Sequence, residues 1–417
     1  MPLTPPADGP IPTALIGIGT RAKKLYLPLA RAIAPWLDFR AVLSPNPESA
    51  GLAAERLAVP AFTDLEALLG SGLVKAAVVL SPIESHHAIS VMLSRAGIHH
   101  LVETTMASTV RQAEEMLAEA RKAGVVLGVA ENYFRFPFDR LARTVAETGA
   151  IGEVRRITCY HDQVGFHGHA RWQRFFEAAP EAVSATAHTM PTARHKESER
   201  RIHEAETFRI CQLHFPGERI AIDMGGNLKG LLGRTPRPGY TEIAGTSGTI
   251  FRGPMGGLSG IAELRCCSSE ALMADGKPDH VAPFVDEASA GVWTGSHARL
   301  PDGRMARWTN PFRPEAVTGN RLREWDGPVV MELLARFAEE IASTTEPEYS
   351  AGDAVMTTRI EMAARESARS GGIAIDPRCD MAGFASEQAA AAAVAEKFGV
   401  DPHDVAAMVR HHFPSAF

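Results

Sequence analysis

The first part of the chain alternates between short apolar runs and longer amphipathic stretches. Apolar residues recur with helical spacing after each run of strand length, and those runs occupy residues 14–16, 39–44, 75–82, 98–103 and 125–132. Strands that alternate with helices in this way predict parallel βαβ units and a doubly wound sheet. Because such sheets bind ligands beyond the carboxyl ends of their strands, the residues that follow each strand are the first candidates for a functional site.

Beyond residue 150 the pattern becomes strand-like. The stretches "EVRRITCYH" (153–161) and "TFRICQLHF" (207–215) suit strands of a second sheet. The charged run at residues 192–206 lacks an apolar face and predicts a solvated segment between strands. Residues 325–343 carry apolar side chains at helical spacing, which predicts an amphipathic helix used for packing.

The last part of the chain predicts two further helices. Residues 386–399 begin with a serine that suits a helix cap and end at a glycine. Residues 401–413 begin with Asp401 as the expected cap and Pro402 in the first turn. Such a helical pair could cover a cleft or extend an oligomer interface.

Composition and charge narrow the function classes. The chain has 417 residues, more than one hydrophobic core normally organises, so two domains are expected. The formal net charge is -6 with both signs mixed along the chain, which argues against a nucleic-acid partner and gives no reason to expect a membrane surface. No apolar run approaches the ~20 residues of a membrane helix, and residues 1–12 lack the features of a secretory signal. Scattered cysteines without a C-x-x-C pair predict reduced thiols in a cytoplasmic protein.

A glycine-rich turn follows the first apolar run. Gly17, Gly19 and Ala22 occupy the G-x-G-x-x-G/A positions between a predicted strand and a predicted helix. The first glycine permits the tight turn, the second lets backbone N–H groups approach a pyrophosphate, and the small third residue lets helix and strand pack closely. We therefore predict a dinucleotide site whose loop residues are Gly17, Ile18, Gly19, Thr20, Arg21 and Ala22.

The end of the second predicted strand bears on the choice between NAD and NADP. An acidic residue there would hydrogen-bond the ribose 2′-OH of NAD, but this chain has Ser44. An arginine would suit the 2′-phosphate of NADP, and Arg21 is the nearest candidate, although a solvated position at the helix start would also explain it. The sequence predicts NAD or NADP as cofactor without a strong preference for NAD.

Several segments together resemble the glucose–fructose oxidoreductase, inositol dehydrogenase and rhizopine catabolism family (Gfo/Idh/MocA). The resemblance runs from about residue 12 to residue 376 and is carried by "GIGTRA", "VVLSPIESHHAISVMLSRAGIHHLVET", "ENYFRFPFDRLARTVAETGAIGEV", "YTEIAGTSGTIF" and "EPEYSAGDAVMTTRIEMAARESARSG". It implies an α/β fold in which a Rossmann domain precedes an α+β domain with a large, open, mostly antiparallel sheet. It also implies NAD(P)-dependent oxidation or reduction of a sugar, a cyclitol or a related small molecule by a homodimer or homotetramer.

The pattern and the resemblance together predict the organisation of the chain. It comprises a flexible arm (1–11), a Rossmann domain (12–135), an α+β substrate and oligomerisation domain (136–376) and a C-terminal helical extension (377–417). The extension lies beyond the resemblance.

Carried over position by position, the resemblance marks further cofactor contacts. These are Ser81, Pro82, His86, Glu103 and Asn132.

The chain departs from the family at two places. Thr104 and Thr105 stand where the family has lysine and proline, and that lysine normally helps to move the hydroxyl proton of the substrate. A lysine can be tuned to act as an acid or base, whereas a threonine hydroxyl can only position or relay a proton. The family's Asp-x-Gly-x-His signature also has no clean copy.

The segment 160–176, "YHDQVGFHGHARWQRFF", supplies the replacement candidates. Asp162, Gly165 and His167 roughly echo the family's Asp, Gly and His. Imidazole is well suited to take a proton near neutral pH, and a nearby carboxylate could orient it. We predict that His167 or His169 is the acid or base, with Asp162 beside it and Thr104 near the nicotinamide ribose.

Other interpretations of the same residues stay open. An H-x-H pair in extended backbone would place both imidazoles on one side, where His167 and His169 could bind a metal with His161 and Asp162, although we predict no metal site. The histidines could simply line a polar cleft. The protein could also be a lyase, isomerase or hydrolase that uses the His161–His169 cluster on the same scaffold, with or without a metal, or a dinucleotide-binding protein without turnover.

Overall fold

The structure, a computed structural model, describes residues 3–198, 201–226, 239–253, 261–289, 291–312, 326–343 and 346–414. Parts of four predicted segments lie outside the described residues: residues 1–2 of the N-terminal arm, residues 199–200 of the charged run, Trp325 of the amphipathic helix and residues 415–417 of the extension.

The first sheet has six parallel strands in the order β3-β2-β1-β4-β5-β6. Their bounds are β1 Ile11–Ile16, β2 Leu37–Leu43, β3 Ala61–Phe62, β4 Ala76–Val79, β5 His99–Val102 and β6 Leu127–Val129. The chain reverses its direction of winding between β1 and β4, and this switch point is where open parallel sheets bind ligands. The predicted doubly wound sheet is confirmed.

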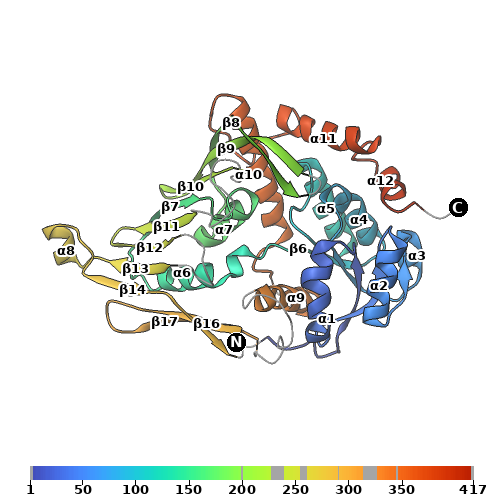
Figure 1. Cartoon of the computed structure of the whole chain (residues 1–417), viewed down its shortest axis with the longest axis horizontal. Coiled ribbons are helices and arrows are strands. Elements are labelled where there is room, and N and C mark those ends of the chain that lie inside the picture. Colours follow the sequence, from blue (N-terminus) through green and yellow to red (C-terminus); the bar gives the residue numbers. More distant parts are fainter. Residues whose placement is uncertain are drawn as a thin grey trace.

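Helices follow each of these strands and cover both faces of the sheet (Figure 1). They are a π-helix at Ala22–Tyr26 continued by α1 Leu27–Ile33, then α2 Pro47–Leu57, α3 Leu65–Gly70, α4 Ile83–Arg95 and α5 Val110–Ala123. A 3₁₀ turn at Tyr133–Arg135 and α6 Pro137–Glu147 lead out of the sheet. The strands are apolar on both faces because helices bury both faces.

The second sheet has eight strands in the order β14-β13-β12-β11-β7-β10-β9-β8. Only β7 and β10 pair in parallel, so the sheet is mostly antiparallel, as predicted. The strands are β7 Val154–Tyr160, β8 Ala182–Ser198, β9 Arg201–Phe215, β10 Arg219–Gly225, β11 Tyr240–Gly245, β12 Gly248–Arg252, β13 Ala262–Cys266 and β14 His280–Pro283.

One face of the second sheet packs against helices. Its core contains Ile157, Leu213 and Ile243 from the sheet together with Trp172 and Ile360 from two of the covering helices. The covering helices are α6, α7 (Phe166–Phe176) and α10 (Ala351–Arg369). Of these helices, α7 and α10 lie on the side that faces the first sheet (Figure 1).

The predicted amphipathic helix is α9, Asp326–Ser343, and it packs on the first sheet. Val330, Leu333 and Phe337 share a core with Leu15 of β1 and Ile33 of α1. This part of the chain therefore crosses back to the first sheet, although it lies within the segment predicted as the second domain.

The charged run at residues 192–206 was predicted as a solvated segment between strands, but its described residues belong to the strands β8 and β9 themselves. Strands β8 and β9 form one long antiparallel hairpin in which His195 faces His203 and Ser198 faces Arg201. Each strand satisfies the backbone groups of the other, so Arg194, Lys196 and Glu204 can stay exposed without an apolar face beside them. Glu206, in contrast, is buried.

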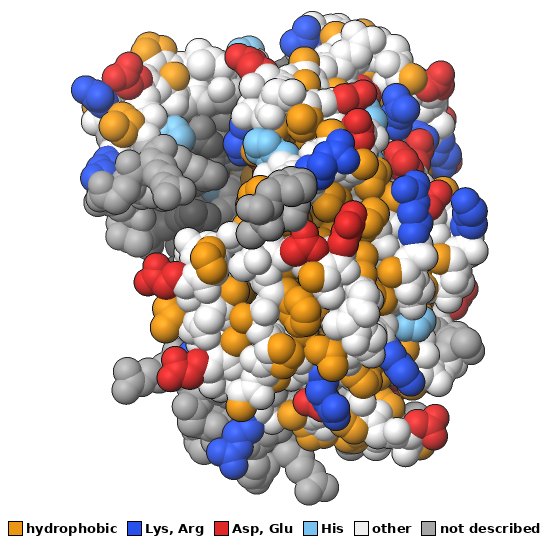
Figure 2. Space-filling model, turned by 90° about the vertical axis from the view of Figure 1, so that its right-hand side faces the viewer, with side chains coloured by type: hydrophobic (Ala, Val, Ile, Leu, Met, Phe, Trp, Pro, Cys, Tyr) orange, Lys and Arg blue, Asp and Glu red, His pale blue; other side chains and the backbone are white. Residues whose placement is uncertain are grey.

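A third, three-stranded sheet was not predicted. It consists of β15 Val285–Ser289, β16 Val292–Arg299 and β17 Met305–Thr309, and the short helix α8, Ser269–Ala274, lies nearby in the chain. None of the described helices has the length and hydropathy that crossing a bilayer requires. On the face drawn in Figure 2, positive and negative side chains are interspersed among apolar ones, in line with the mixed charge of the sequence.

The C-terminal extension forms α11, Ala385–Phe398, and α12, Val405–His412. The cap of α12 is Asp404, whose carboxylate accepts from the N–H of Ala407, and not Asp401 as predicted. Asp401 instead accepts from the N–H of His403 in the preceding turn. Both helices dock on the first sheet's helices α4 and α5, with Met408 fully buried (Figure 1).

Glu387 joins the extension to the first sheet's layer. Its carboxylate, 7% exposed, accepts from the backbone N–H groups of Val110 and Arg111 at the start of α5, at 3.1 and 3.0 Å. A carboxylate at this position satisfies donors that a helix start leaves unpaired and faces the positive end of the helix dipole.

We therefore predict that Glu387→Gln loosens the extension. Loss of the charge at a helix start costs roughly 1–2 kcal/mol. Local opening of α11 should become about tenfold more frequent, because about 1.4 kcal/mol corresponds to a factor of ten. Hydrogen–deuterium exchange of α11 amides measures this, with Glu396→Gln on the exposed side of the same helix as the control. Equal protection in the two variants would contradict the prediction.

Candidate functional site

The loops after β1 and β4 meet at the carboxyl edge of the first sheet. Gly17 has φ +90°, and a Cβ atom there would lie 2.6 Å from the backbone nitrogen of Ser81. Only glycine permits this approach. At Gly19, in contrast, a Cβ atom would meet nothing within 4 Å. The second glycine thus faces open space in front of a helix start, where a pyrophosphate would fit.

His86 ties together the loops after β4 and β5. Its Nε2 lies 2.8 Å from the carbonyl oxygen of Ser81, and its Nδ1 lies 3.0 Å from that of Thr105. Burial lowers the pKa of His86, although both carbonyl groups favour its charged form. Pro82 is the N-cap residue that directly precedes α4, the helix that contains His86. These residues shape the edge of the predicted cofactor site.

Glu103, at the end of β5, is a buried carboxylate with two partners from the glycine-loop side. Its Oε1 accepts from Arg21 Nε at 2.6 Å and from the Tyr26 hydroxyl at 2.9 Å. Burial, reinforced by the negative charge of Glu103, raises the pKa of Tyr26 well above its usual value. Arg21 therefore lies on the β5 side of the glycine loop, and the Glu103 carboxylate keeps a cationic partner.

Ser44 lies on the opposite side, at the end of β2. It is buried, and its hydroxyl accepts from the N–H of Asn46 at 3.3 Å. In the strand order, β1 and β4 separate β2 from β5, so Arg21 in its pairing with Glu103 points away from Ser44. The sequence analysis considered both Ser44 and Arg21 for contact with the ribose 2′ group. In the structure the two residues lie on different sides of the glycine loop.

Thr104 follows Glu103 and is half-buried. Its backbone N–H donates to Glu103 Oε2 at 3.0 Å, and its hydroxyl lies 3.5 Å from the same oxygen. The Thr104–Thr105 peptide bond is cis. The hydroxyl thus lies beside a carboxylate at the position of the family's lysine.

His167 is held by Glu131, a residue that the sequence did not single out. Glu131 follows β6 and is fully buried. Its Oε1 accepts from the backbone N–H groups of Asn132 and Tyr133 at 3.0 and 2.9 Å, and its Oε2 lies 2.7 Å from His167 Nδ1. The Tyr133 ring lies against the imidazole, with centroids 4.3 Å apart.

This arrangement fixes the tautomer of His167. When Nδ1 carries the proton and donates to Glu131, Nε2 is left as an acceptor. The side chain of His167 is 32% exposed, so the imidazole reaches the surface of the site. An oriented imidazole with a buried carboxylate behind it is an arrangement that can accept or donate one proton. In the sequence, Glu131 is distinguished only as an acidic residue that directly follows an apolar, strand-like run.

His169 lies on another side of the same helix. The segment was expected in extended backbone for a metal pair, but it forms α7, where residues two apart point ~200° away from each other. His169 is fully buried, with Nε2 3.8 Å from Asp223 Oδ2 and Nδ1 3.6 Å from Glu361 Oε2. Burial lowers its pKa to about 4. Within the described residues, no group of three metal-binding side chains occurs.

Asp162 is engaged elsewhere. Its Oδ2 accepts from the Thr241 hydroxyl at 2.5 Å and from Arg252 Nε at 3.0 Å. Burial would raise its pKa, but the positive charges of Arg252 and Arg171 lower the value to about 2. Asp162 therefore stabilises the second sheet in this structure, and Glu131 is the carboxylate that orients His167.

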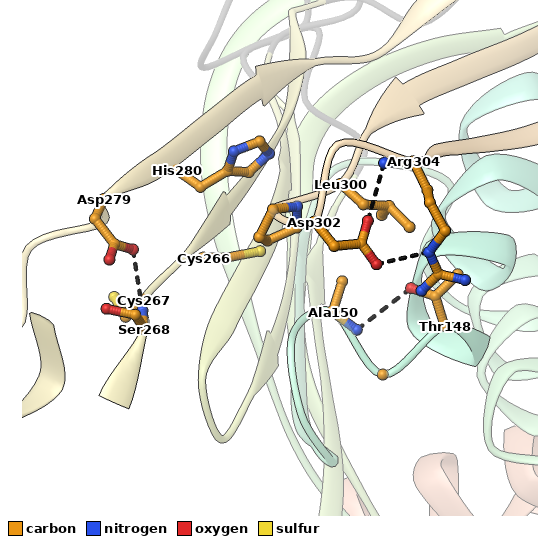
Figure 3. Close-up of a pocket in the computed structure, with 12 residues that line it drawn as sticks. Thr148, Ala150, Cys266, Cys267, Ser268, Asp279, His280, Leu300, Asp302 and Arg304 are labelled. Atoms are coloured by element: carbon orange, nitrogen blue, oxygen red, sulfur yellow. Dashed lines mark hydrogen bonds and ion pairs between the residues drawn. The ribbon is translucent and has the colours of Figure 1, made fainter. Parts of the chain in front are cut away.

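One cavity lies beside these residues, and another lies far from them. One of about 460 Å³ lies between the glycine loop and the segment after β6, lined by Thr20, Arg21, Asn132 and Tyr133 among others. Another, of about 490 Å³, lies at the far end of the second sheet (Figure 3). In that hollow Arg304 pairs with Asp302, and the polar groups largely face partners within the protein. We assign it no role.

Comparison with known proteins identifies relatives of the first sheet. Residues 11–131 match the Gfo/Idh/MocA family, described as an oxidoreductase family with an NAD-binding Rossmann fold. The chain is 29% identical over 209 residues to 1,5-anhydro-D-fructose reductase of Ensifer adhaerens, covering 50% of this chain and 58% of that protein. It is 35% identical over 130 residues to an NADP(+)-dependent scyllo-inositol 2-dehydrogenase of Bacillus subtilis, covering 30% of this chain and 39% of that protein.

Solved structures match over most of the chain. Levoglucosan dehydrogenase in complex with NADH and levoglucosan has a TM-score of 0.66 at 20% identity and covers 88% of this chain and 100% of that chain. Aldose–aldose oxidoreductase from Caulobacter crescentus, complexed with glycerol, has a TM-score of 0.61 at 17% identity and covers 88% and 99%. At these identities the likeness establishes the two-sheet fold.

The glycine loop yields a prediction with an internal control. Gly19→Val places a side chain in the open space before the helix, so the protein should fold normally but bind NADH at least about tenfold more weakly, because the pyrophosphate cannot approach. Gly17→Val should instead lower the melting temperature, since its Cβ overlaps the Ser81 backbone. Fluorescence titration and thermal melts separate the two. Unchanged NADH affinity in Gly19→Val would show that the site is misplaced.

Proposed function

The first domain of this chain belongs to the Gfo/Idh/MocA family of oxidoreductases, and on that premise we propose that the protein oxidises or reduces a small polyol, sugar or cyclitol with NAD or NADP. The curated relatives named above act on an anhydro sugar and an inositol, which supports this substrate class. The alignments span only part of those relatives, so the argument rests on the site itself.

The observation that carries the proposal is the contact between Glu131 and His167. Oxidation of an alcohol releases a hydride from carbon and a proton from oxygen, and the oxidised nicotinamide supplies the hydride acceptor when it is bound. The chain must provide the proton acceptor. His167 Nε2 is free to take it, because Nδ1 is committed to Glu131 at 2.7 Å. In the reverse direction the same nitrogen returns the proton to the carbonyl oxygen.

The surrounding residues hold the two partners in place. Gly19 leaves space for the pyrophosphate, Gly17 lets the loops after β1 and β4 approach each other, and His86 fixes the loops after β4 and β5. Glu103 and Thr104 line the position of the family's lysine without supplying a basic nitrogen. His167 is therefore assigned the proton, because it is the one of the two predicted histidines whose imidazole is exposed. His169 is fully buried on another side of α7, and we assign it a structural role.

Two features of the proposal remain predictions of the sequence. We propose a homodimer or homotetramer, as the family resemblance implies, and a cytoplasmic location, as the reduced cysteines imply. All five cysteines are free in the structure.

We predict that His167→Ala lowers turnover by ~10²- to 10⁴-fold, the usual contribution of a positioned acid or base. NADH affinity should stay within about twofold, because His167 acts on the substrate proton. Adding Thr104→Lys to this variant should not restore turnover, since a lysine there lacks the imidazole's position. Full activity of His167→Ala, or strong stimulation of the parent by Thr104→Lys, would contradict the assignment.

Glu131→Gln tests the positioning role separately. The amide keeps the size of the carboxylate but removes the negative charge behind the imidazole that takes the substrate proton, so kcat for alcohol oxidation should fall by about tenfold or more. KM and NADH affinity should stay within about twofold, because Glu131 does not contact either ligand directly. A purely structural role would instead lower the melting temperature and leave kcat of the folded protein unchanged.

We also predict that NAD is not strongly preferred over NADP. Ser44 is buried and neutral, so the end of β2 has no carboxylate to hold the ribose diol or to repel a 2′-phosphate. Titration should give dissociation constants within about a hundredfold of each other, roughly 2.7 kcal/mol. Ser44→Asp should increase the ratio in favour of NAD. A parental preference for NAD above a hundredfold would show that another residue discriminates.

A further inference from the structure

A cavity of about 310 Å³ lies beside the loops after β4 and β5, beneath the C-terminal extension. Ile83, Thr105 and Phe166 line it, and each directly follows or precedes a predicted site residue, namely Pro82, Thr104 and His167. It therefore adjoins the edge at which doubly wound sheets bind ligands.

Two helices form opposite walls of this cavity with the same spacing of residues. Helix α10 contributes Thr358, Glu361, Met362 and Arg365. Helix α11 contributes Ala390, Ala393, Val394 and Lys397. In each case the positions are i, i+3, i+4 and i+7, which is one face of an α-helix. Figure 1 shows α11 beside the upper end of α10 and above α5. The extension thus presents a face to the cavity.

The residues on α11 leave the cavity open. Ala390 and Ala393 end at Cβ, so the space between the two helices is not filled by side chains from this wall. The helix is nevertheless anchored on both sides of the cavity. The Ser386 N–H donates to Glu366 of α10 at 2.8 Å, and Lys397 pairs with Glu84 of α4 at 2.5 Å.

The four charged side chains that line the cavity, Glu84, Glu361, Arg365 and Lys397, sum to zero, but Arg209, which is not part of the lining, adds one positive charge beside them. Glu361 is held by Arg209 through two hydrogen bonds of 2.8 and 2.9 Å. Burial would raise the pKa of Glu361, but Arg209 lowers it to about 2. Glu84 is paired with Lys397. Both carboxylates are therefore already neutralised.

Arg365 carries the remaining positive charge. It donates only its Nε to Glu361, at 3.2 Å, and its side chain lines the cavity while remaining half exposed to solvent. The two terminal amino groups of its guanidinium are left for a ligand. A guanidinium binds a carboxylate through two parallel hydrogen bonds, a geometry that a neutral hydroxyl cannot match.

We propose that this cavity, closed by α11, binds the carboxylate end of an acidic substrate through Arg365. The proposal rests on the function proposed above and narrows its substrate class from polyols in general to sugar acids. It gives the C-terminal extension, which lies outside the family resemblance, the role of a wall that selects the substrate.

The test compares acids with neutral molecules of the same carbon chain. Calorimetric titration of the NADH-loaded protein uses gluconate and galactonate against glucitol and galactitol. The acid of at least one pair should bind about tenfold or more tightly than its neutral partner, as expected when a charge-assisted hydrogen bond is gained. Arg365→Gln should abolish the difference, whereas Arg369→Gln, an exposed arginine one turn later on α10, should preserve it.

A second pair of variants tests the wall. Ala393→Leu should fill the cavity and weaken acid binding, whereas Ala392→Leu, exposed and outside the cavity lining, should not. Equal binding of acids and neutral partners, or selectivity that survives Arg365→Gln, would overturn the proposal. Each titration is repeated without NADH. Acid binding without any NADH binding would refute the dinucleotide function alone, and NADH binding without acid selectivity would refute this inference alone.

Discussion

The buried carboxylate of Glu131 is the interaction on which the site depends. It ends a strand of the first sheet, accepts two backbone N–H groups of its own segment and holds an imidazole from α7, which packs on the second sheet. The two backbone bonds fix the carboxylate, so its free oxygen can fix the histidine. The geometry of the proposed proton acceptor is thus defined across both layers of the fold, and any relative shift of the layers would misplace Nε2.

The order of strands and helices in the first sheet was predictable because helices cover both of its faces. Its strands are therefore continuous apolar runs. The spacing of Gly17, Gly19 and Ala22 in its first loop is typical of dinucleotide-binding sheets. The site was less predictable because its decisive contact joins residues 36 positions apart. Asp162 was nearer to His167 in sequence, but Arg252 and Arg171 engage it from other elements. Nothing local distinguishes an acid held by distant arginines from one held by a histidine.

Other errors have the same origin. Extended backbone was considered for the segment around His167 because it would suit an H-x-H metal pair, and Gly165 and Gly168 lower the helix propensity there. Burial of Trp172 and Phe176 in the core of the second sheet outweighs that local preference. The charged hairpin of β8 and β9 was missed because strand pairing supplies its stability, and pairing leaves no apolar pattern in either strand alone. Local sequence patterns predicted the helices and strands that bury one face in a core. They failed where a partner strand or a distant core determines the secondary structure.

The cap at the start of α5 has a consequence for the order of folding. Val110 receives its hydrogen-bond acceptor from Glu387, which lies 277 positions further along the chain. During synthesis, α5 therefore leaves the ribosome long before the carboxylate that completes its first turn exists. The first sheet can assemble early, but the N–H groups of Val110 and Arg111 lack the Glu387 carboxylate until α11 has been translated and docked. Completion of the first sheet's layer thus depends on a segment that is translated 277 positions after Val110.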